Sequence, residues 1–248
     1  FLLSALYSAE WLWLYPISPP LPVPGKLGWV THFLSAKGSE GSVYLAVVLL
    51  VILSLYNLFR PFRWWSALVV WLCYTNLMDR AWMAGSGGQQ LVANVLFWNI
   101  FLSLGRENAL HELASTSAFW MIRIQLILAY FVTGIYKLTG TSWLVGTAVG
   151  IAVSDSAFGP AWLADFSMIT VLLTWSVLAL QFLLPIAVWF CRTRVPILII
   201  GAIFHIATAL FMGIPEMAFA FIAVYAIWLS NDESERVKGA MTLRRIAF

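Results

Sequence analysis

Long runs of apolar residues limit what this chain can fold into more than any other feature of its sequence. Two of them, residues 119–138 and 168–190, alone reach the roughly 20 residues that a helix needs to cross a bilayer. Hydrophobic residues make up 62% of the chain and charged residues only 10%, which excludes a water-soluble globule, a disordered segment and a nucleic-acid-binding protein. The alternating pattern of a membrane β-barrel is absent. The sequence therefore predicts an all-α, polytopic membrane protein.

Shorter apolar runs bring the expected number of transmembrane spans to about eight, in one membrane domain over residues 1–248. Residues 1–15 are expected to be the end of a first span. Residues 16–42 are expected to be an outer loop, because four prolines between Ile17 and Pro24 exclude regular helix. The run from Trp143 to Val153 is too short to cross and favours an interfacial or re-entrant helix. The remaining runs, which need flanking residues to cross, are 43–59, 64–78, 89–104, 195–211 and 217–230.

Basic residues are distributed unevenly between the two sides of this arrangement. If the loop from Arg60 to Arg63 is cytoplasmic and the spans alternate, the outer side holds only Lys26, Lys37 and Arg80. The cytoplasmic side then holds Arg60, Arg63, Arg106, Arg192, Arg194, Arg236, Lys238, Arg244 and Arg245. This excess of positive charge inside predicts that residues 231–248 form a cytoplasmic tail and that residues 140–165 lie outside.

The run 119–138 carries two basic residues, Arg123 and Lys137. An ionisable group in hydrocarbon is costly unless it is paired or hydrated, so both are functional candidates. At 100° per residue, one helix face holds Arg123, Ile127, Tyr130, Gly134 and Lys137. We expect this face to point inward, and Leu126, Ala129 and Val132 to face lipid. Two explanations stay open for each basic residue: snorkelling to the nearest headgroups, or a functional role, which for Lys137 is that of a neutral amine acting as a base.

Other polar residues within apolar runs are less specific. His205 lies in the middle of a span, one turn from Thr208, and such a histidine is more often a hydrogen-bonded core residue than a ligand. Gln89, Gln90 and Asn94 begin another span, where amides commonly bond across helices. His111 is expected in a loop, so it does not form a convincing pair of haem ligands with His205. No metal-binding spacing and no phosphate loop occur.

The stretch MIRIQLILAYFVTGIYKLTGTSWLVG fits the pattern Arg-x-Gln-x4-Tyr-Phe-x2-Gly-x2-Lys-Leu-x4-Trp-x2-Gly. It resembles the core motif of the vitamin K-dependent gamma-carboxylase-like membrane domain, also called the HTTM domain. The segments LMDRAW and FHIATALFMG resemble the family's earlier and later helices. The resemblance covers nearly the whole chain and implies a short member of bacterial type, in the bacterial inner membrane, without the lumenal β domain of the carboxylase.

The resemblance implies roles for several residues. The family carboxylase oxidises a reduced quinone, vitamin K, with a lysine as base, and Lys137 stands at that lysine's position. Tyr136 replaces a second lysine of the carboxylase, and Gln89 or Gln90 replaces its histidine. Two hypotheses follow. In the first, the chain is a membrane enzyme that acts on a quinone, a lipid or a membrane peptide, with Lys137 as base and Arg123, Gln125, Tyr130 and His205 around it. In the second, the chain is a non-catalytic accessory or scaffold subunit of a larger membrane complex.

Overall fold

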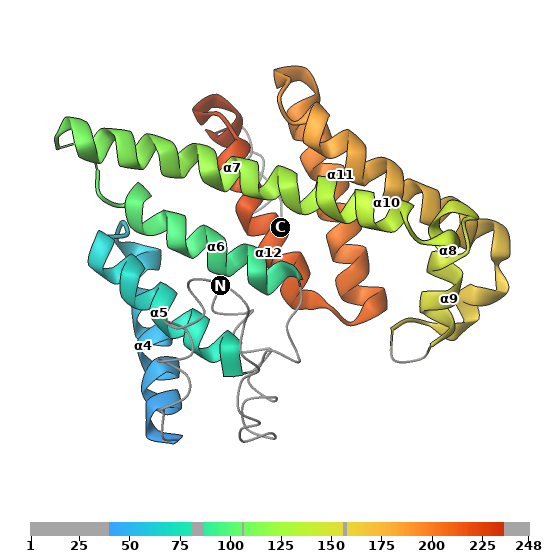
Figure 1. The fold of residues 1–248 in the computed structure, drawn as a ribbon, viewed down its shortest axis with the longest axis horizontal. Helices are drawn as coiled ribbons and strands as arrows, with labels where there is room; N and C mark the ends of the chain where they lie inside the picture. The colour runs from blue at the N-terminus through green and yellow to red at the C-terminus, as the bar shows by residue number, and fades with distance from the viewer. Residues whose placement is uncertain (1–39, 81–86, 106, 156–157, 236–248) are drawn as a thin grey trace, which may run out of the picture. The chain divides into compact units, whose positions relative to one another are not determined.

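The computed structural model describes residues 40–80, 87–105, 107–155 and 158–235, and the regular structure in these ranges is helical (Figure 1). The chain divides between Ile122 and Arg123 into two compact units, which we describe one at a time. The longer helices are α4 (Glu40–Phe59), α5 (Trp64–Arg80), α6 (Gly87–Leu102), α7 (Ala109–Leu138), α10 (Ser167–Ala187), α11 (Cys191–Met212) and α12 (Pro215–Tyr225).

Three of the described helices, α7, α10 and α11, are long and apolar enough to cross a membrane. The helical class of fold predicted from the sequence is therefore confirmed. Each apolar run predicted as a span between residues 43 and 230 coincides with a helix. The segment 1–15 and most of the expected outer loop lie outside the described residues. Residues 40–42, which the sequence assigned to that loop, belong to α4.

In the first unit, α4 packs against α5 and α5 against α6. Ser66, in the first turn of α5, accepts a hydrogen bond from the amide of Arg63 (3.1 Å) and donates one to the side-chain carbonyl of Asn57 on α4 (3.3 Å). This serine therefore both stabilises the start of α5 and links it to α4. The apolar contact between α5 and α6 includes Trp71 and Phe97, whose ring centroids lie 5.4 Å apart. Its most buried residues include Val70, Tyr74, Leu77, Val92 and Leu96.

Helix α7 begins ten residues before the apolar run that predicted it. The amide of His111 donates to the Asn108 side chain (2.9 Å), and the amide of Glu112 donates to the Asn108 carbonyl (2.9 Å). Asn108 thus caps the helix, and Glu112 lies in the first turn, where a carboxylate is favoured by the helix dipole. The expectation that His111 lies in a loop is wrong, because a capped polar turn extends the helix beyond its apolar part.

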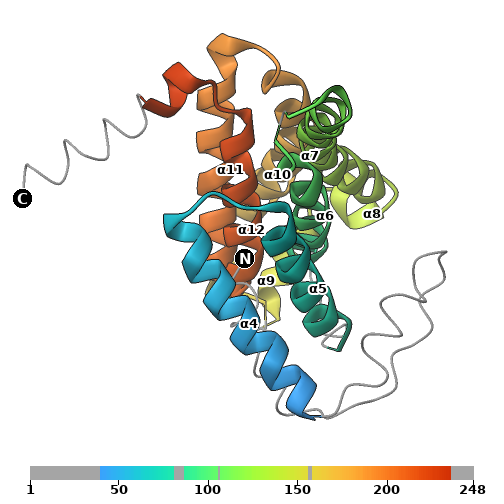
Figure 2. The same cartoon turned by 90° about the vertical axis from the view of Figure 1, so that its left-hand side faces the viewer.

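The second unit is built on α10, α11 and α12, with α11 packed against both of the others (Figure 2). The turn between α11 and α12 has two residues suited to it. Gly213 follows the last helical residue with φ of 65°, a conformation that favours glycine, and Pro215 opens α12 at a position where no amide hydrogen is needed. The chain therefore reverses direction within three residues.

Between α7 and α10 the described residues form three short helices, α8 (Thr141–Leu144), α9 (Ala148–Ser154) and η2 (Ala161–Asp165). The sequence predicted one interfacial or re-entrant helix over Trp143–Val153. Gly146, with φ of 81°, interrupts that run and separates α8 from α9. Residues 231–235 of the predicted tail are helical, and the rest of the tail lies outside the described residues.

Candidate functional site

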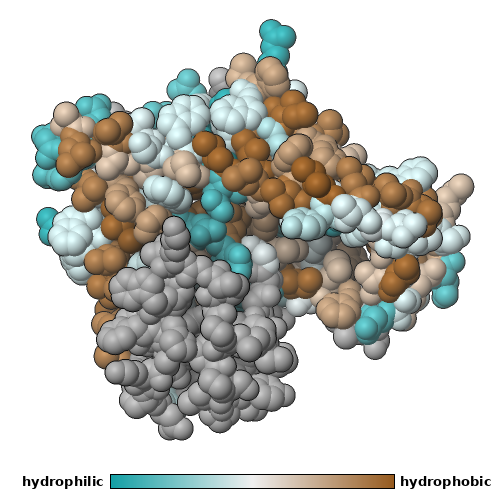
Figure 3. Space-filling model, in the orientation of Figure 1, coloured by the Kyte–Doolittle hydropathy of each residue, from teal (hydrophilic) through white to brown (hydrophobic). Residues whose placement is uncertain are grey.

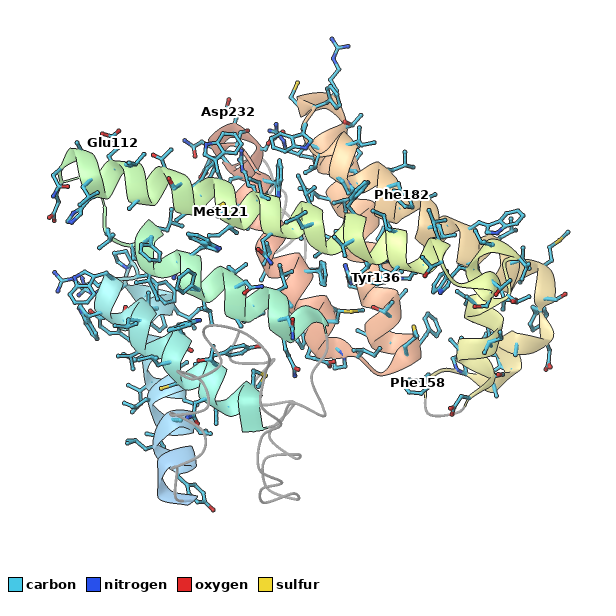
Figure 4. All side chains as sticks on the ribbon, in the orientation of Figure 1. Glu112, Met121, Tyr136, Phe158, Phe182 and Asp232 are labelled. Atoms are coloured by element: carbon cyan, nitrogen blue, oxygen red, sulfur yellow. The ribbon has the colours of Figure 1, made fainter. Side chains whose placement is uncertain are left out.

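The inward face predicted for α7 has a buried centre. Tyr130 is 3% exposed, and Gly134 is buried against α10, where a Cβ atom would lie 3.0 Å from the ring of Phe182 (Figure 4). Val132 is 41% exposed, as the opposite face requires. Leu126 is fully buried, however, so the expectation that it faces lipid is wrong. The buried surface of α7 is therefore wider than the polar stripe that predicted it.

Tyr130 lies at the centre of a hydrogen-bonded group that joins three helices. Its hydroxyl oxygen is 2.6 Å from Nε2 of His205 on α11, and it is also hydrogen-bonded to the hydroxyl of Tyr225 on α12. His205 is 2% exposed and Tyr225 is 5% exposed. Since each hydroxyl can donate one hydrogen bond and accept others, the three side chains form a continuous chain through which a proton can be displaced.

Aromatic and aliphatic groups enclose this hydrogen-bonded chain. The ring of Phe221 stacks on His205 with centroids 4.3 Å apart and meets the ring of Tyr130 edge-on at 5.3 Å. On α11, Gly201 makes room for Tyr225: a Cβ atom there would lie 2.5 Å from the tyrosine oxygen. Within the described residues, Nδ1 of His205 has no hydrogen-bond partner. Such surroundings disfavour a charged imidazolium, so the neutral ring is the form that fits.

Lys137 lies two helical turns beyond Tyr130, which is about 10 Å along the axis. Its Nζ is 5.0 Å from the centre of the Trp143 ring on α8. A cation over an indole ring is stabilised by the ring's quadrupole, so this contact favours the ammonium form. The lysine is half-buried, whereas its neighbour Tyr136 is 73% exposed. Lys137 is thus partly covered by an aromatic side chain while it remains at the rim of the unit.

Arg123 lies the same distance from Tyr130 in the other direction and has a different kind of environment. Both Nε and Nη2 donate to the carbonyl oxygen of Ile227, at 3.2 and 3.0 Å. Its guanidinium carbon is 4.8 Å from the centre of the Trp228 ring, which is 1% exposed. Ile227 and Trp228 belong to the short helix η3 (Ala226–Trp228), which follows α12. Arg123 therefore joins α7 to the end of α12 through main-chain and ring contacts.

A second polar cluster follows η3. The amide of Ser230 donates to Oε2 of Glu233 (2.7 Å), and the amide of Glu233 donates to the Ser230 hydroxyl (3.2 Å). This reciprocal arrangement is a capping box at the start of helix 231–235. Arg194 Nη1 donates to the same carboxylate (3.1 Å). The hydrogen bond from the Ser230 amide, assisted by the charge of Arg194, lowers the pKa of Glu233.

The structure brings together only some of the residues that the sequence predicted. Tyr130 and His205 are in direct contact, while Arg123 and Lys137 lie at opposite ends of the same helix face. Gln125 is also on α7 and is half-buried.

Gln89 and Gln90 belong to α6 in the first unit, where Gln89 is 3% exposed and Gln90 is exposed. Of these two amides, Gln89 is therefore the one placed inside its unit.

Sequence reasoning missed the partners of these residues. Tyr225 and Trp228 lie in an apolar run, where their spacing gives no sign of a contact with α7 about a hundred residues earlier. Ser230 and Glu233 do carry a signal, since Ser-x-x-Glu is the sequence pattern of a capping box. Within the described residues, no group of three or more His, Cys, Asp or Glu side chains is arranged to hold a metal ion.

Comparisons with protein-family models, with curated proteins and with solved structures find no match to this chain.

Proposed function

We propose that this chain is a membrane enzyme of the gamma-carboxylase-like class that acts on a lipid-soluble substrate with an acidic hydroxyl, such as a quinol. The observation that carries the proposal is the buried group formed by Tyr130, His205 and Tyr225. Polar side chains of this kind are costly inside an apolar helical bundle, and those that persist there commonly serve a function. Tyrosine and histidine are also side chains that transfer protons.

Lys137 is the proposed base. In its neutral form, the amine would take a proton from the substrate hydroxyl, leaving an oxyanion and an ammonium group. The ring of Trp143, 5.0 Å from Nζ, would then stabilise the ammonium. The distance of about 10 Å along the helix between Lys137 and Tyr130 leaves room for a substrate with polar atoms near both. Arg123 and Gln125 would support this face of α7.

The proposed enzyme crosses the membrane about eight times. In this arrangement α4, α5, α6 and the α12–η3 segment cross together with α7, α10 and α11; the span that the sequence predicts over residues 1–15 lies outside the described residues. The distribution of basic residues supports a cytoplasmic C-terminus, and the family resemblance supports the bacterial inner membrane. Labelling of a Ser234→Cys variant from each side tests this topology, and outside labelling at residue 234 would contradict it.

A second function is favoured by a different observation. The ring of Trp143 covers Lys137, and Arg123 is held by η3, so both basic residues have contacts that a purely structural role would explain. In that case the chain is an accessory or scaffold subunit of a larger membrane complex, and its partners are lipids and other subunits. Purification from native membranes distinguishes the two functions: a bound quinone or lipid substrate supports the enzyme, and a stoichiometric protein partner without one supports the subunit.

The base itself is tested by two substitutions in a deletion strain complemented by each variant. Lys137→Arg keeps the positive charge but cannot supply a neutral amine, and Lys137→Met keeps much of the side-chain volume without the charge. The enzyme requires both variants to fail at normal protein levels. Arg192→Met, at an exposed basic residue at the start of α11, is the matched control and should complement fully. Full complementation by both Lys137 variants would remove the lysine from catalysis.

A further inference from the structure

Residues 141–155 and 158–165, which we call the lateral segment, have an unusual surface for a connection between two helices. The lateral segment contains α8, α9 and η2, and its only charged residues are Asp155 and Asp165. No lysine or arginine occurs between Lys137 and Arg192. At least half of the area of each of several large apolar side chains is exposed, namely those of Leu144, Val145, Ile151, Phe158 and Trp162. A connecting segment immersed in water rarely presents such a surface.

The lateral segment is fixed to the side of α10. The amide of Val149, in the first turn of α9, donates to the hydroxyl of Thr174 (3.1 Å), which in turn donates to the carbonyl of Thr170 (2.8 Å). Both threonines are buried. Gly150 packs on Thr170, where a Cβ atom would lie 3.2 Å from the hydroxyl oxygen. The two elements therefore approach each other closely along the first two turns of α10.

Gly146 provides a third point of close approach. Its φ of 81° disfavours any other residue, and a Cβ atom there would lie 2.9 Å from the side chain of Val171. The turn between α8 and α9 is thus pressed onto α10 as well. Both α8 and α9 are therefore held against α10, so the position of α10 in a membrane determines theirs.

These contacts determine how deep α9 lies in a membrane that α10 crosses. Helix α10 has 21 residues, which corresponds to about 31 Å and matches a hydrocarbon core of about 30 Å. Thr174 lies seven residues after the start of α10, which is about 10 Å along its axis. The start of α9 is therefore level with the outer third of a membrane that α10 crosses. The hydrogen bond to Thr174 also satisfies a main-chain amide that a helix start leaves unpaired, as hydrocarbon surroundings require.

The outward-facing side chains continue this apolar surface onto α10. Figure 3 shows hydrophobic residues, in brown, along the part of the second unit where α10 runs. Beyond the lateral segment, the exposed residues at the start of α10 include Met168, Leu172 and Trp175. Tryptophan is one of the side chains that concentrate near the membrane interface. The lateral segment and the first half of α10 thus present one apolar surface.

We propose that the lateral segment is inserted into the bilayer leaflet that surrounds the N-terminal half of α10, and that the acyl chains of this leaflet cover it. It enters and leaves the leaflet on the same side, because α9 and η2 return the chain to the start of α10. The inference stands on packing and exposed surface alone and does not depend on the proposed enzymatic activity.

Spin labels measure this depth directly. In the full chain carrying Cys73→Ala and Cys191→Ser, labels would be attached to Ile151→Cys and Trp162→Cys and studied in phosphatidylcholine–phosphatidylglycerol vesicles. Collision with oxygen reports hydrocarbon, and collision with a water-soluble nickel complex reports water. Leu172→Cys is the matched control in lipid, because residue 172 is near Thr174 in depth. Asp232→Cys, on the exposed surface of helix 231–235, is the control in water.

The oxygen-to-nickel collision ratio at residues 151 and 162 should be severalfold above that at residue 232 and closer to that at residue 172. A ratio closer to that at residue 232 would overturn the proposal, and so would shielding from both reagents, which would indicate a protein cover. Thr174→Val keeps the side-chain shape but removes the acceptor for the Val149 amide. It should increase the mobility of the label at residue 151 while leaving that at residue 172 unchanged, and an unchanged label at residue 151 would also count against the proposal.

Discussion

Arg123 and Lys137 lie at opposite ends of one face of α7, and each has a tryptophan ring beside its charged group. The centre of the ring is 4.8 Å from the guanidinium carbon of Arg123 and 5.0 Å from Nζ of Lys137. The two environments differ in all other respects. Arg123 also donates two hydrogen bonds to the carbonyl of Ile227, and its tryptophan is fully enclosed. Among the described residues, the ammonium group of Lys137 contacts the ring of Trp143 alone.

The difference separates an anchoring cation from one that can change partners. A planar guanidinium with two hydrogen bonds to one carbonyl is held in a single geometry, and leaving it would cost those bonds. An ammonium over a ring keeps its freedom to rotate and is held by a weaker, less directional attraction. Similar residues beside similar rings are thus held to different degrees at the two ends of one helix face.

The largest effect is expected from Arg123→Gln. It removes charge-assisted hydrogen bonds to Ile227 and the contact with Trp228, so the free energy of unfolding should fall by about 2–4 kcal/mol. Equilibrium unfolding in detergent micelles measures this change. The matched substitution Lys137→Gln should cost less than about 1 kcal/mol. Equal losses for the two variants would remove the distinction between the two ends of α7.

A smaller effect is expected from Arg123→Lys, which keeps the charge. Lysine has a single ammonium in place of the planar fork, so it cannot reproduce the two hydrogen bonds to Ile227. We expect a loss of about 1–2 kcal/mol in the same unfolding measurement. Full stability of this variant would mean that charge alone, rather than geometry, holds α7 to η3.

Trp143→Leu sharpens the comparison at the other end. The substitution keeps an apolar side chain on α8 but removes the cation–π contact with Lys137, which should lower the free energy of unfolding by about 0.5–1 kcal/mol. The loss should disappear when Lys137 is already Gln, since the ring then has no cation to stabilise. A double-mutant cycle tests this, and additive losses would show that the ring acts only by packing.

The smallest effect is expected on the pH dependence of stability, through Glu233, which follows η3. The pKa of Glu233 is lowered in the folded protein by the Ser230 amide and Arg194, so its stabilising contribution is fully present above about pH 4.3, the ordinary value for glutamate. This contribution is lost as the pH falls through the lowered pKa. Thermal unfolding between pH 7 and acid should therefore lose part of its pH dependence in Glu233→Gln. Asp232→Asn, at the neighbouring exposed residue, is the control and should retain the wild-type profile.

Much of the secondary structure could be predicted from apolar runs. A helix that lies in lipid or in an apolar core needs apolar side chains along its whole length, so such a run marks the helix. The inward position of Tyr130 and Gly134 could also be predicted, since a helical period of 3.6 residues places them on the polar stripe. Two expectations failed for the same reason. The fully buried Leu126 and the helical turn at His111 depend on packing and capping, which hydropathy does not report.

The site was less predictable than the helices. Tyr130 and His205 stood out because they are polar residues in apolar runs. Tyr225 did not, because a tyrosine is common in such runs and its partner is 95 residues away. The pairing depends on Gly201 and on the sharp turn at Gly213, which bring α11 and α12 together. A contact that needs two helices and a turn to be in place cannot be inferred from the pattern of any one segment.

The sharp turn at Gly213 and Pro215 also bears on how the chain enters a membrane. Helix α11 carries His205, and α12 carries Phe221, whose ring stacks on that histidine. Two helices joined by so short a turn can leave the insertion machinery as a pair, with the polar imidazole already shielded on one side. Tyr130, made 75 residues earlier, would by then be in the bilayer. If the helices enter the bilayer in the order of their synthesis, Tyr130 is therefore already present as a hydrogen-bond partner for His205 when α11 and α12 arrive.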